Sequence, residues 1–425
     1  MTHFGVICPA ESGHLNTFIP IAQELKQRGH RLTFIIIAEA QAKVSAAGFE
    51  VGVIGEDLFP LGKMEERLIE LGKLSGLAAL KYTIALVKDN ANIIFRDAPQ
   101  IIEEAGIEAL LVDQSYREGG SVAEFMGIPF ITICSAVVLN RDSEVPPFNT
   151  PWEYSPNFIG RLRNKIGYKI LNSVTKPISD NINEYRRSKN LPLHASPNEA
   201  YSTLAQITHQ PKEFEFPRKH LPSCFHFTGP YNSASRREPV AFPWSELTGK
   251  PLIYASMGTL QNRLTEIFET IASGCAGLDA QLVITMGGAD IPESLRSLPG
   301  NPIVVSYAPQ LELLPQTALT ITHGGMNTTL ECLTHGVPMV AIPIANDQPG
   351  ISARIVWSGV GEMIPMKKLT TENLEQTIKK VLTTDSYKEN ALRLQENIKH
   401  SGGVTQAADI IEGVMATGKP VLAKH

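Results

Sequence analysis

One stretch of the chain carries residue types that can hold a phosphate group without a metal ion. The apolar segment Leu319–Thr322 is followed by His323, two glycines, Asn327 and Thr328. Glycines let a backbone approach a ligand closely, and the free N–H groups at the start of a helix point at an anion. The order of strand, glycine turn and helix start predicts an anion site, with a purely structural turn as the alternative interpretation.

Two more polar loops follow apolar segments in the same part of the chain. Residues 307–310 come after the segment 302–306, and residues 346–348 come after the segment 337–343. Ligands of open α/β sheets bind at the carboxyl ends of the strands. We therefore expect these loops to form one site with the glycine turn.

A histidine and an aspartate in the first half of the chain could perform acid–base chemistry. His14 lies in an expected loop, residues 11–14, after the predicted strand Phe4–Ala10. Asp113 closes a second predicted strand, Ala109–Asp113, at the same sheet edge. A positioned histidine can take a proton from a hydroxyl group, and an aspartate beside it orients the ring and balances its charge. The alternatives are a surface-loop histidine and an aspartate that caps a helix.

Several common motifs are absent from the sequence. No GxGxxG follows a strand and no GxxxxGK[ST] occurs, so neither a dinucleotide fingerprint nor a P-loop is present. There is also no Asp-x-Asp, the usual way of holding a divalent metal against a sugar diphosphate. Phosphate binding is therefore expected to use protein groups alone, with no metal and no resident cofactor.

The composition is that of an ordinary globular protein. Of 425 residues, 43% are hydrophobic and 19% are charged, and the formal net charge is −5. A nucleic-acid binder would show a basic excess or a clustered basic face, and no nucleic-acid partner is expected. The five cysteines are scattered and form no CxxC pair, which is typical of small buried side chains in a reducing compartment. No leader segment or long apolar run is found, so a cytoplasmic protein is expected, with peripheral membrane contact left open.

The first half of the chain alternates short apolar segments with helical patterns. Strands are expected at 4–10, 31–38, 109–113 and 129–135, and helices at 18–28 and 121–126. Strands that are nearly continuous in apolar residues are typical of a parallel sheet buried on both faces. Residues 57–99 are helical and amphipathic, and their leucine stripe from Leu68 to Leu80 is interpreted as packing on this sheet rather than as the wall of a ligand pocket.

The character of the chain changes between residues 229 and 250, where a polar, turn-rich stretch is typical of a linker. A second series of apolar segments then begins, at 251–256, 280–286, 302–306, 319–322 and 337–343. The sequence therefore predicts an α/β protein with two doubly wound domains, residues 1–228 and 251–425, joined by the linker 229–250.

The polar positions between 307 and 348 together resemble the signature segment of the UDP-sugar glycosyltransferases. The matching residues are Tyr307, Ala308, Gln310, His323, Gly325, Asn327, Thr328, Glu331, Asp347 and Gln348. The loop of Ser256, Gly258 and Thr259 is similar to the first phosphate-side loop of the same family. The resemblance implies the GT-B architecture, in which two Rossmann-like domains face each other across a cleft and the final helix can cross back onto the first domain.

The resemblance also implies roles for these residues. Tyr307 would stack on uracil, while Ala308, Gln310 and Glu331 would hold the base edge and the ribose. His323, Asn327 and Thr328 would hold the diphosphate, and Asp347 and Gln348 would bind the sugar hydroxyls. His14 would be the general base of an inverting displacement, and Asp113 its partner. Tyr307 and Met326 stand where plant members usually carry tryptophan.

The likeness extends over nearly the whole chain and is strongest to the bacterial zeaxanthin glucosyltransferases. It includes residues 128–133, 216–218, 221–227, 255–261 and 347–354. This implies transfer of glucose from UDP-glucose to a hydroxylated carotenoid or another lipophilic acceptor, bound by residues 1–228 through loops within 57–95 and 140–175. Flavonoids, other phenols and macrolides are alternative acceptors. A UDP-sugar epimerase and a non-catalytic UDP-sugar-binding protein are alternatives from other classes.

Overall fold

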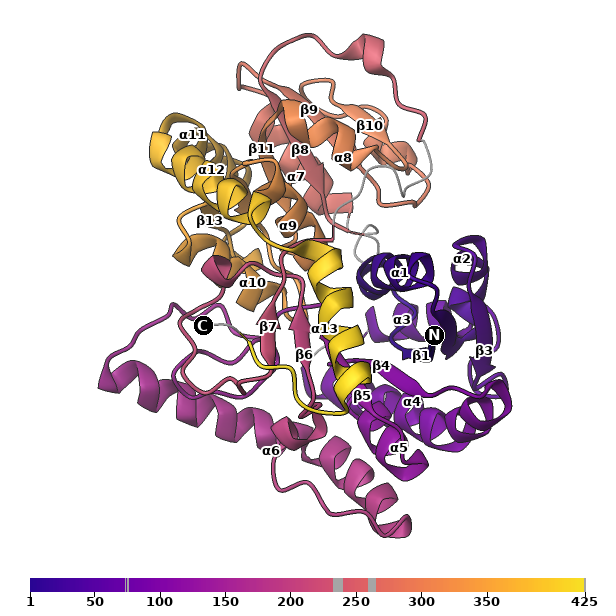
Figure 1. Cartoon of the computed structure of the whole chain (residues 1–425). Coiled ribbons are helices and arrows are strands. Elements are labelled where there is room, and N and C mark those ends of the chain that lie inside the picture. The colour runs from indigo at the N-terminus through magenta and orange to yellow at the C-terminus, as the bar shows by residue number, and fades with distance from the viewer. Residues whose placement is uncertain (73, 75, 232–239, 259–264, 424–425) are drawn as a thin grey trace.

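The computed structural model describes residues 1–72, 74, 76–231, 240–258 and 265–423 of the chain. It contains two parallel sheets, each with helices and a hydrophobic core on both faces (Figure 1). The first sheet has the strand order β3-β2-β1-β4-β5-β6-β7. Its strands are β1 (His3–Ile7), β2 (Arg31–Ile37), β3 (Glu50–Ile54), β4 (Ala109–Asp113), β5 (Phe130–Cys134), β6 (Gln206–Thr208) and β7 (Phe225–Phe227).

The second sheet has the order β10-β9-β8-β11-β12-β13, and neighbouring strands in both sheets are parallel. Its strands are β8 (Leu252–Ser256), β9 (Gln281–Thr285), β10 (Ile303–Val305), β11 (Thr317–Thr322), β12 (Met339–Ala341) and β13 (Gly361–Met363). The predicted architecture of two doubly wound α/β domains is confirmed. The borders at 228 and 251 stay predictions, and residues 232–239 of the predicted linker lie outside the described residues.

Helices of the first half are α1 (Ser12–Gln27), α2 (Gln41–Ala46), α3 (Lys63–Gly72), α4 (Gly76–Ala105), α5 (Glu118–Met126) and α6 (Phe158–Ser188). The second half contributes α7 (Thr265–Cys275), α8 (Gln310–Leu313), α9 (Met326–Thr334), α10 (Gln348–Trp357), α11 (Thr371–Thr383), α12 (Asp385–Lys399) and α13 (Gly403–Thr417). In the described residues, no helix has the length and apolar character needed to span a bilayer.

Helix α1 begins earlier than the sequence indicates, and the expected loop over residues 11–14 is wrong. Glu11 has the extended backbone of a helix cap, and the helix starts at Ser12. Leu15 and Phe18 are both buried on this helix, so the face that packs on the sheet reaches into its first turn. His14 therefore lies on a helix whose position is set by core packing. Gly29, with φ of 90°, lies in the turn between α1 and β2.

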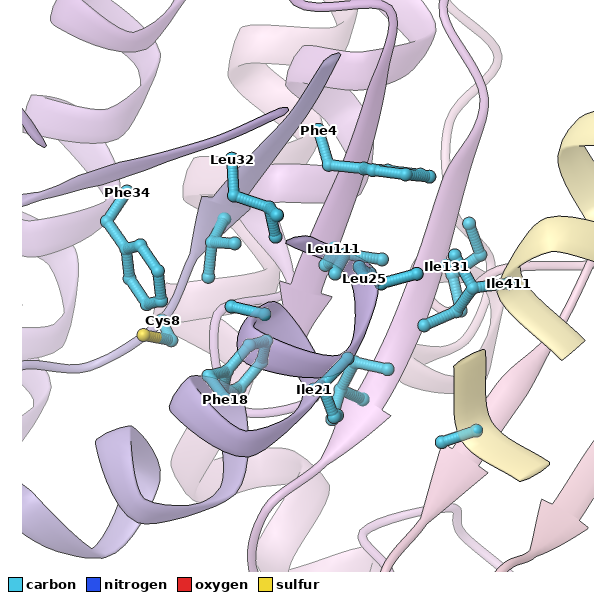
Figure 2. Packing of buried hydrophobic residues seen from close by; sticks show 14 of the residues in the cluster. Phe4, Cys8, Phe18, Ile21, Leu25, Leu32, Phe34, Leu111, Ile131 and Ile411 are labelled. Atoms are coloured by element: carbon cyan, nitrogen blue, oxygen red, sulfur yellow. The ribbon is translucent and has the colours of Figure 1, made fainter. Parts of the chain in front are cut away.

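The last helix returns to the first sheet and completes its core. Figure 2 shows Ile411 of α13 beside Ile131 of β5 and Leu25 of α1, within a cluster that also contains Phe4 and Phe34. Arg28, the C-cap residue of α1, binds α13 through Asp409 (2.7 Å) and Glu412 (2.6 Å). A buried ion pair between Arg354 and Glu215, at 2.5 Å, adds a second contact between the two halves of the chain.

The leucine stripe between Leu68 and Leu80 is not core in the part that the structure describes. The predicted helical region divides into α3 and α4, and Leu74, between them, is 38% exposed. Leu71 and Leu80 are half-buried, and the side chains of Leu68 and Leu77 lie outside the described part. Met64 of α3 and the α4 residues Ile93, Ile94 and Ile102 are buried instead, so α3 and α4 pack on the sheet through residues before and after the stripe.

The cysteines behave as their spacing predicts. All five are buried and carry free thiols. Burial raises the pKa of the Cys8 thiol well above its usual range. A neutral, apolar thiol is typical of a structural core position.

Candidate active site

A pocket of about 300 Å³ lies where the carboxyl ends of strands from the two sheets face each other. Its walls include most of the predicted site residues. These are His14, Ser256, Gly258, Tyr307, Ala308, Gln310, His323, Gly325, Asn327, Thr328, Glu331, Asp347 and Gln348. Asp113 is buried behind His14, and Thr259 lies outside the described residues.

The first-domain side of the pocket presents a histidine–aspartate pair. His14 stands in the first turn of α1, and its Nδ1 lies 2.9 Å from Oδ2 of Asp113, the last residue of β4. Only 2% of the Asp113 side chain is exposed, against 23% of the His14 side chain. Because Nδ1 faces the aspartate, Nε2 is the ring nitrogen available to a ligand in the pocket.

Two serines complete the surroundings of the carboxylate. The backbone N–H and Oγ of Ser115 donate to Oδ1 of Asp113, at 2.8 and 2.6 Å. Oγ of Ser135, directly after β5, donates to Oδ2 at 2.5 Å and lies 2.7 Å from His14 Nδ1. Each carboxylate oxygen thus has donors that favour its charged form.

The pair is charged at neutral pH. Burial lowers the pKa of His14, but the charge and hydrogen bond of Asp113 outweigh this effect and raise the pKa to about 9. Burial raises the pKa of Asp113, yet the His14 charge and the hydrogen bonds from His14, Ser115 and Ser135 bring it below its usual range. The fraction of neutral His14, the form that can accept a proton, therefore grows as the pH rises toward 9.

The second-domain side of the pocket is the start of α9. Gly325 precedes this helix with extended backbone, and no side chain caps the helix. The first N–H groups of α9 therefore remain available beside the pocket, where the helix dipole also favours an anion. The side chains of Asn327 and Thr328 line the same wall.

His323 is held against this turn by two glycines. A Cβ built at Gly325 would lie 2.5 Å from His323 Nε2, and one built at Gly258 would lie 2.7 Å from the same atom. Burial lowers the pKa of His323 to about 4, so the ring is neutral near pH 7. A neutral imidazole can donate one hydrogen bond to a phosphate oxygen without contributing a charge.

We predict that Gly325→Ala weakens UDP binding by at least about tenfold, since the new methyl group must displace either His323 or the first turn of α9. Isothermal titration calorimetry with UDP measures this change. Gly277→Ala is the matched control, because a Cβ there meets no atom closer than 3.7 Å and the residue is exposed. Equal UDP affinity in the two variants would contradict the close contact at Gly325.

The end of the pocket where the resemblance implies a nucleotide combines an exposed ring with a buried polar network. Tyr307 is 47% exposed and can offer its ring to a base. Gln310 donates to Oε2 of buried Glu331 at 2.5 Å and accepts from the hydroxyl of Tyr254 at 3.0 Å. The Gln310 amide is therefore held by protein groups, and Tyr254 fixes the orientation in which it meets a ligand.

Contacts across the pocket join the two halves of the chain beside His14 and Asp347. Nδ2 of Asn327 donates to the carbonyl of Gly13 at 2.7 Å, directly beside His14. Asp347 Oδ2 accepts from the backbone N–H of Val137 at 3.4 Å. Burial raises the pKa of Asp347. Oε1 of Gln348 accepts from the N–H groups of Ile344 and Ala345, at 2.8 and 2.9 Å, which turns its amide NH₂ toward other partners.

Sequence reasoning missed Ser115, Ser135 and Tyr254. Ser135 is the last residue of a predicted strand at the edge that holds His14, so the strand-end rule could have found it. Tyr254 lies within β8 and gives no such signal. Across the residues that the structure describes, no three His, Cys, Asp or Glu side chains come together as metal ligands would.

Comparison with known proteins decides the family. Residues 6–405 match the profile of the UDP-glucoronosyl and UDP-glucosyl transferase family. The chain belongs to this family. The enzyme is a glycosyltransferase, and the resemblance predicted from residues 307–348 is confirmed.

Its similarity to curated relatives extends over the full length. The enzyme is 33% identical to a zeaxanthin glucosyltransferase of Pantoea ananas, over 100% of this chain and 98% of the relative. It is 28% identical to a zeaxanthin glucosyltransferase of Pseudescherichia vulneris, over 99% of this chain and 100% of the relative.

Solved structures confirm the GT-B fold. The kitacinnamycin glycotransferase superposes with a TM-score of 0.75 at 22% identity, over 97% of this chain and 98% of its own. The calicheamicin glycosyltransferase CalG4 gives a TM-score of 0.74 at 21% identity, over 99% and 100% of the two chains.

Proposed function

We propose that the enzyme transfers glucose from UDP-glucose to a hydroxyl group of a lipophilic acceptor such as zeaxanthin. One observation carries the proposal. A single pocket joins the His14–Asp113 pair of one sheet to the free start of α9 in the other. The first group can accept a proton and the second can hold a diphosphate, and sugar transfer from a nucleotide requires both.

The proposed reaction is a single displacement that inverts the anomeric carbon. Nε2 of neutral His14 takes the proton of the acceptor hydroxyl as that oxygen attacks the anomeric carbon. The bond from this carbon to the UDP oxygen breaks on the opposite face, and UDP leaves with the electron pair. Asp113, 2.9 Å from Nδ1, stabilises the imidazolium that forms.

The leaving diphosphate is stabilised by protein groups in this proposal, with no metal and no resident cofactor. The N–H groups at the start of α9 and the side chains of His323, Asn327 and Thr328 surround its expected position. Asp347 and Gln348 bind sugar hydroxyls, and Tyr307 stacks on uracil. Glu331 and Gln310 bind the ribose.

The names of the relatives support glucose as the sugar and zeaxanthin as an acceptor, since two of them are zeaxanthin glucosyltransferases. Zeaxanthin is long and apolar, so peripheral contact with a membrane is part of the proposal. Within the predicted acceptor loops, Leu61 is 77% exposed and Leu74 is 38% exposed. Apolar side chains in this region are available to such a ligand.

We predict that glucoside formation continues at an unchanged rate, within about twofold, after dialysis against EDTA, because helix N–H groups replace the metal as the electrostatic partner of the diphosphate. The test combines UDP-glucose with zeaxanthin in detergent micelles and, separately, with simple phenols. Product is measured by chromatography with and without EDTA, and Mg²⁺ is added back as the control. Loss of activity in EDTA that Mg²⁺ restores would contradict metal independence.

The same panel separates the alternatives. Glucosides of many phenols but not of zeaxanthin would indicate a promiscuous small-molecule enzyme. Conversion of UDP-glucose to another UDP-sugar without any acceptor would indicate an epimerase. Binding of UDP-glucose with no turnover on any acceptor would leave a non-catalytic binding protein.

A further inference from the structure

The first half of α6 exposes apolar side chains on its outward face. A helix on the surface of a globular protein normally turns its apolar face to the core and its polar face to water. Here the exposed fractions are 78% for Phe158, 75% for Ile159, 47% for Leu162, 53% for Ile166 and 59% for Ile170. These five residues are named the α6 stripe below.

The stripe is continuous and distinct from the face that packs on the protein. Phe158, Leu162, Ile166 and Ile170 follow one another every four residues, so their side chains lie on one side of the helix. The buried residues of the same segment belong to the opposite side: Gly160, Asn164, Gly167, Tyr168 and Leu171. Packing on the domain therefore leaves the stripe uncovered, and α6 lies along the lower edge of the molecule in Figure 1.

Basic side chains flank the stripe. Residues 158–176 contain Arg161, Arg163, Lys165, Lys169 and Lys176 and no acidic residue, although the whole chain has a net charge of −5. Within the described residues, Lys165 and Lys169 are exposed and no ion pair joins either of them to an acidic side chain. The local charge of this segment is therefore positive, opposite in sign to the net charge of the chain.

We propose that the α6 stripe docks the enzyme on a membrane surface that contains anionic lipids. Aliphatic and phenyl side chains enter the boundary between headgroups and acyl chains, and the exposed Lys165 and Lys169 extend to the phosphate headgroups. Arg161 and Lys176 are paired with Glu144 and Asp180 instead. Charge complementarity favours this occupant over a second copy of the chain, because two stripes face to face would bring their basic flanks together.

A series of packing contacts connects α6 to the wall of the pocket. A Cβ built at Gly167 would lie 2.8 Å from the ring of Trp152 and 3.0 Å from Pro147, so α6 packs on the segment that contains both. Phe148 follows Pro147 in this segment, and its carbonyl oxygen contacts Gly350 of α10. Gly350 lies two residues after Gln348, which lines the pocket. The idea that docking delivers a membrane-borne acceptor to the pocket rests on the proposed function. The docking proposal itself does not depend on that function.

Flotation with vesicles of phosphatidylglycerol and phosphatidylcholine tests the proposal on the full-length protein. The wild type is expected to float with these vesicles and to bind vesicles of phosphatidylcholine alone far more weakly. The triple variant Phe158→Ser/Ile166→Ser/Ile170→Ser is expected to lose affinity by on the order of a hundredfold. Lys165→Gln/Lys169→Gln is expected to lose roughly fivefold for each charge removed. Leu193→Ser/Leu392→Ser is the control, since these leucines are 48% and 44% exposed outside the stripe.

Turnover of a water-soluble phenol separates docking from catalysis. The expected acceptor loop within 140–175 is wrong from residue 158 onward, because these residues form helix α6, and no stripe residue lines the pocket described above. The triple variant is therefore expected to glucosylate the phenol like the wild type and to lose glucosylation of zeaxanthin held in vesicles. If the wild type glucosylates neither the phenol nor zeaxanthin, the proposed function fails while the flotation result still decides the docking. Unchanged flotation of the triple variant would overturn the docking proposal. A wild-type dimer that the same substitutions dissociate would also overturn it, because a second copy would then cover the stripe.

Discussion

His14→Ala is expected to lower kcat by roughly 10²–10⁴-fold, the usual contribution of a positioned general base. The affinity for UDP is expected to stay close to that of the wild type. The reason is that the proposed function assigns donor binding to α9 and the loops of the second sheet, and assigns His14 to the acceptor hydroxyl. Steady-state kinetics with a phenol acceptor, together with calorimetry of UDP binding, measures the two effects separately.

The matched control for this substitution is His400→Ala. His400 is 77% exposed at the end of α12, and in the described part of the chain its ring pairs with Glu396 alone, at 3.1 Å. Its removal is expected to leave both kcat and UDP affinity unchanged. Retention of full activity in His14→Ala would contradict the assignment of the base.

Asp113→Asn is expected to lower kcat by roughly a hundredfold or more and to change the pH dependence of the reaction. The proposed base, His14, can accept a proton only when neutral, so kcat/KM of the wild type is expected to rise with pH until the pH passes the pKa of His14, about 9. In the variant the carboxylate charge that raises this pKa is gone, while burial, which lowers it, remains. The rising limb of the pH profile therefore moves to lower pH.

The pH profile of kcat/KM between pH 5 and 10 checks this shift, with Asp279→Asn as the control. Asp279 is 90% exposed and pairs with Lys250 on the surface. Substitution of Asp279 is expected to leave the rising limb of the kcat/KM profile at the same pH as in the wild type. A limb that stays at the wild-type position in Asp113→Asn would mean that another group, not His14, titrates.

Much of the site could be predicted because a parallel sheet gathers the ends of its strands. His14, Asp113, His323 and Asp347 each follow a strand or end one, and the structure places them around one pocket or directly behind it. Their proposed roles stay predictions. Residue spacing does not show which side chains form hydrogen bonds to one another. Ser135 is an example, since its hydroxyl contacts both His14 and Asp113.

Strands β3, β6, β7 and β13 are absent from the strands expected from the sequence, and short or partly buried segments give a weak apolar pattern. β6 and β7 are three residues long and contain Gln206 and His226, so their apolar signal is short. β3 is half-buried and lies at the edge of its sheet, where fewer apolar residues are needed. The prediction that the leucine stripe packs on the sheet was wrong for another reason. Its spacing is helical and apolar, but the tertiary packing leaves Leu74 exposed.

The most direct test of the account is the anomeric configuration and acceptor dependence of the product formed from UDP-glucose. The wild type is incubated with UDP-glucose and a hydroxylated acceptor, and the glucoside is analysed by NMR. The account predicts a β-glucoside, because the donor is α-linked and a single displacement inverts the carbon, with UDP released only when acceptor is present. An α-glucoside, or UDP-glucose that is bound and never transferred, would contradict it.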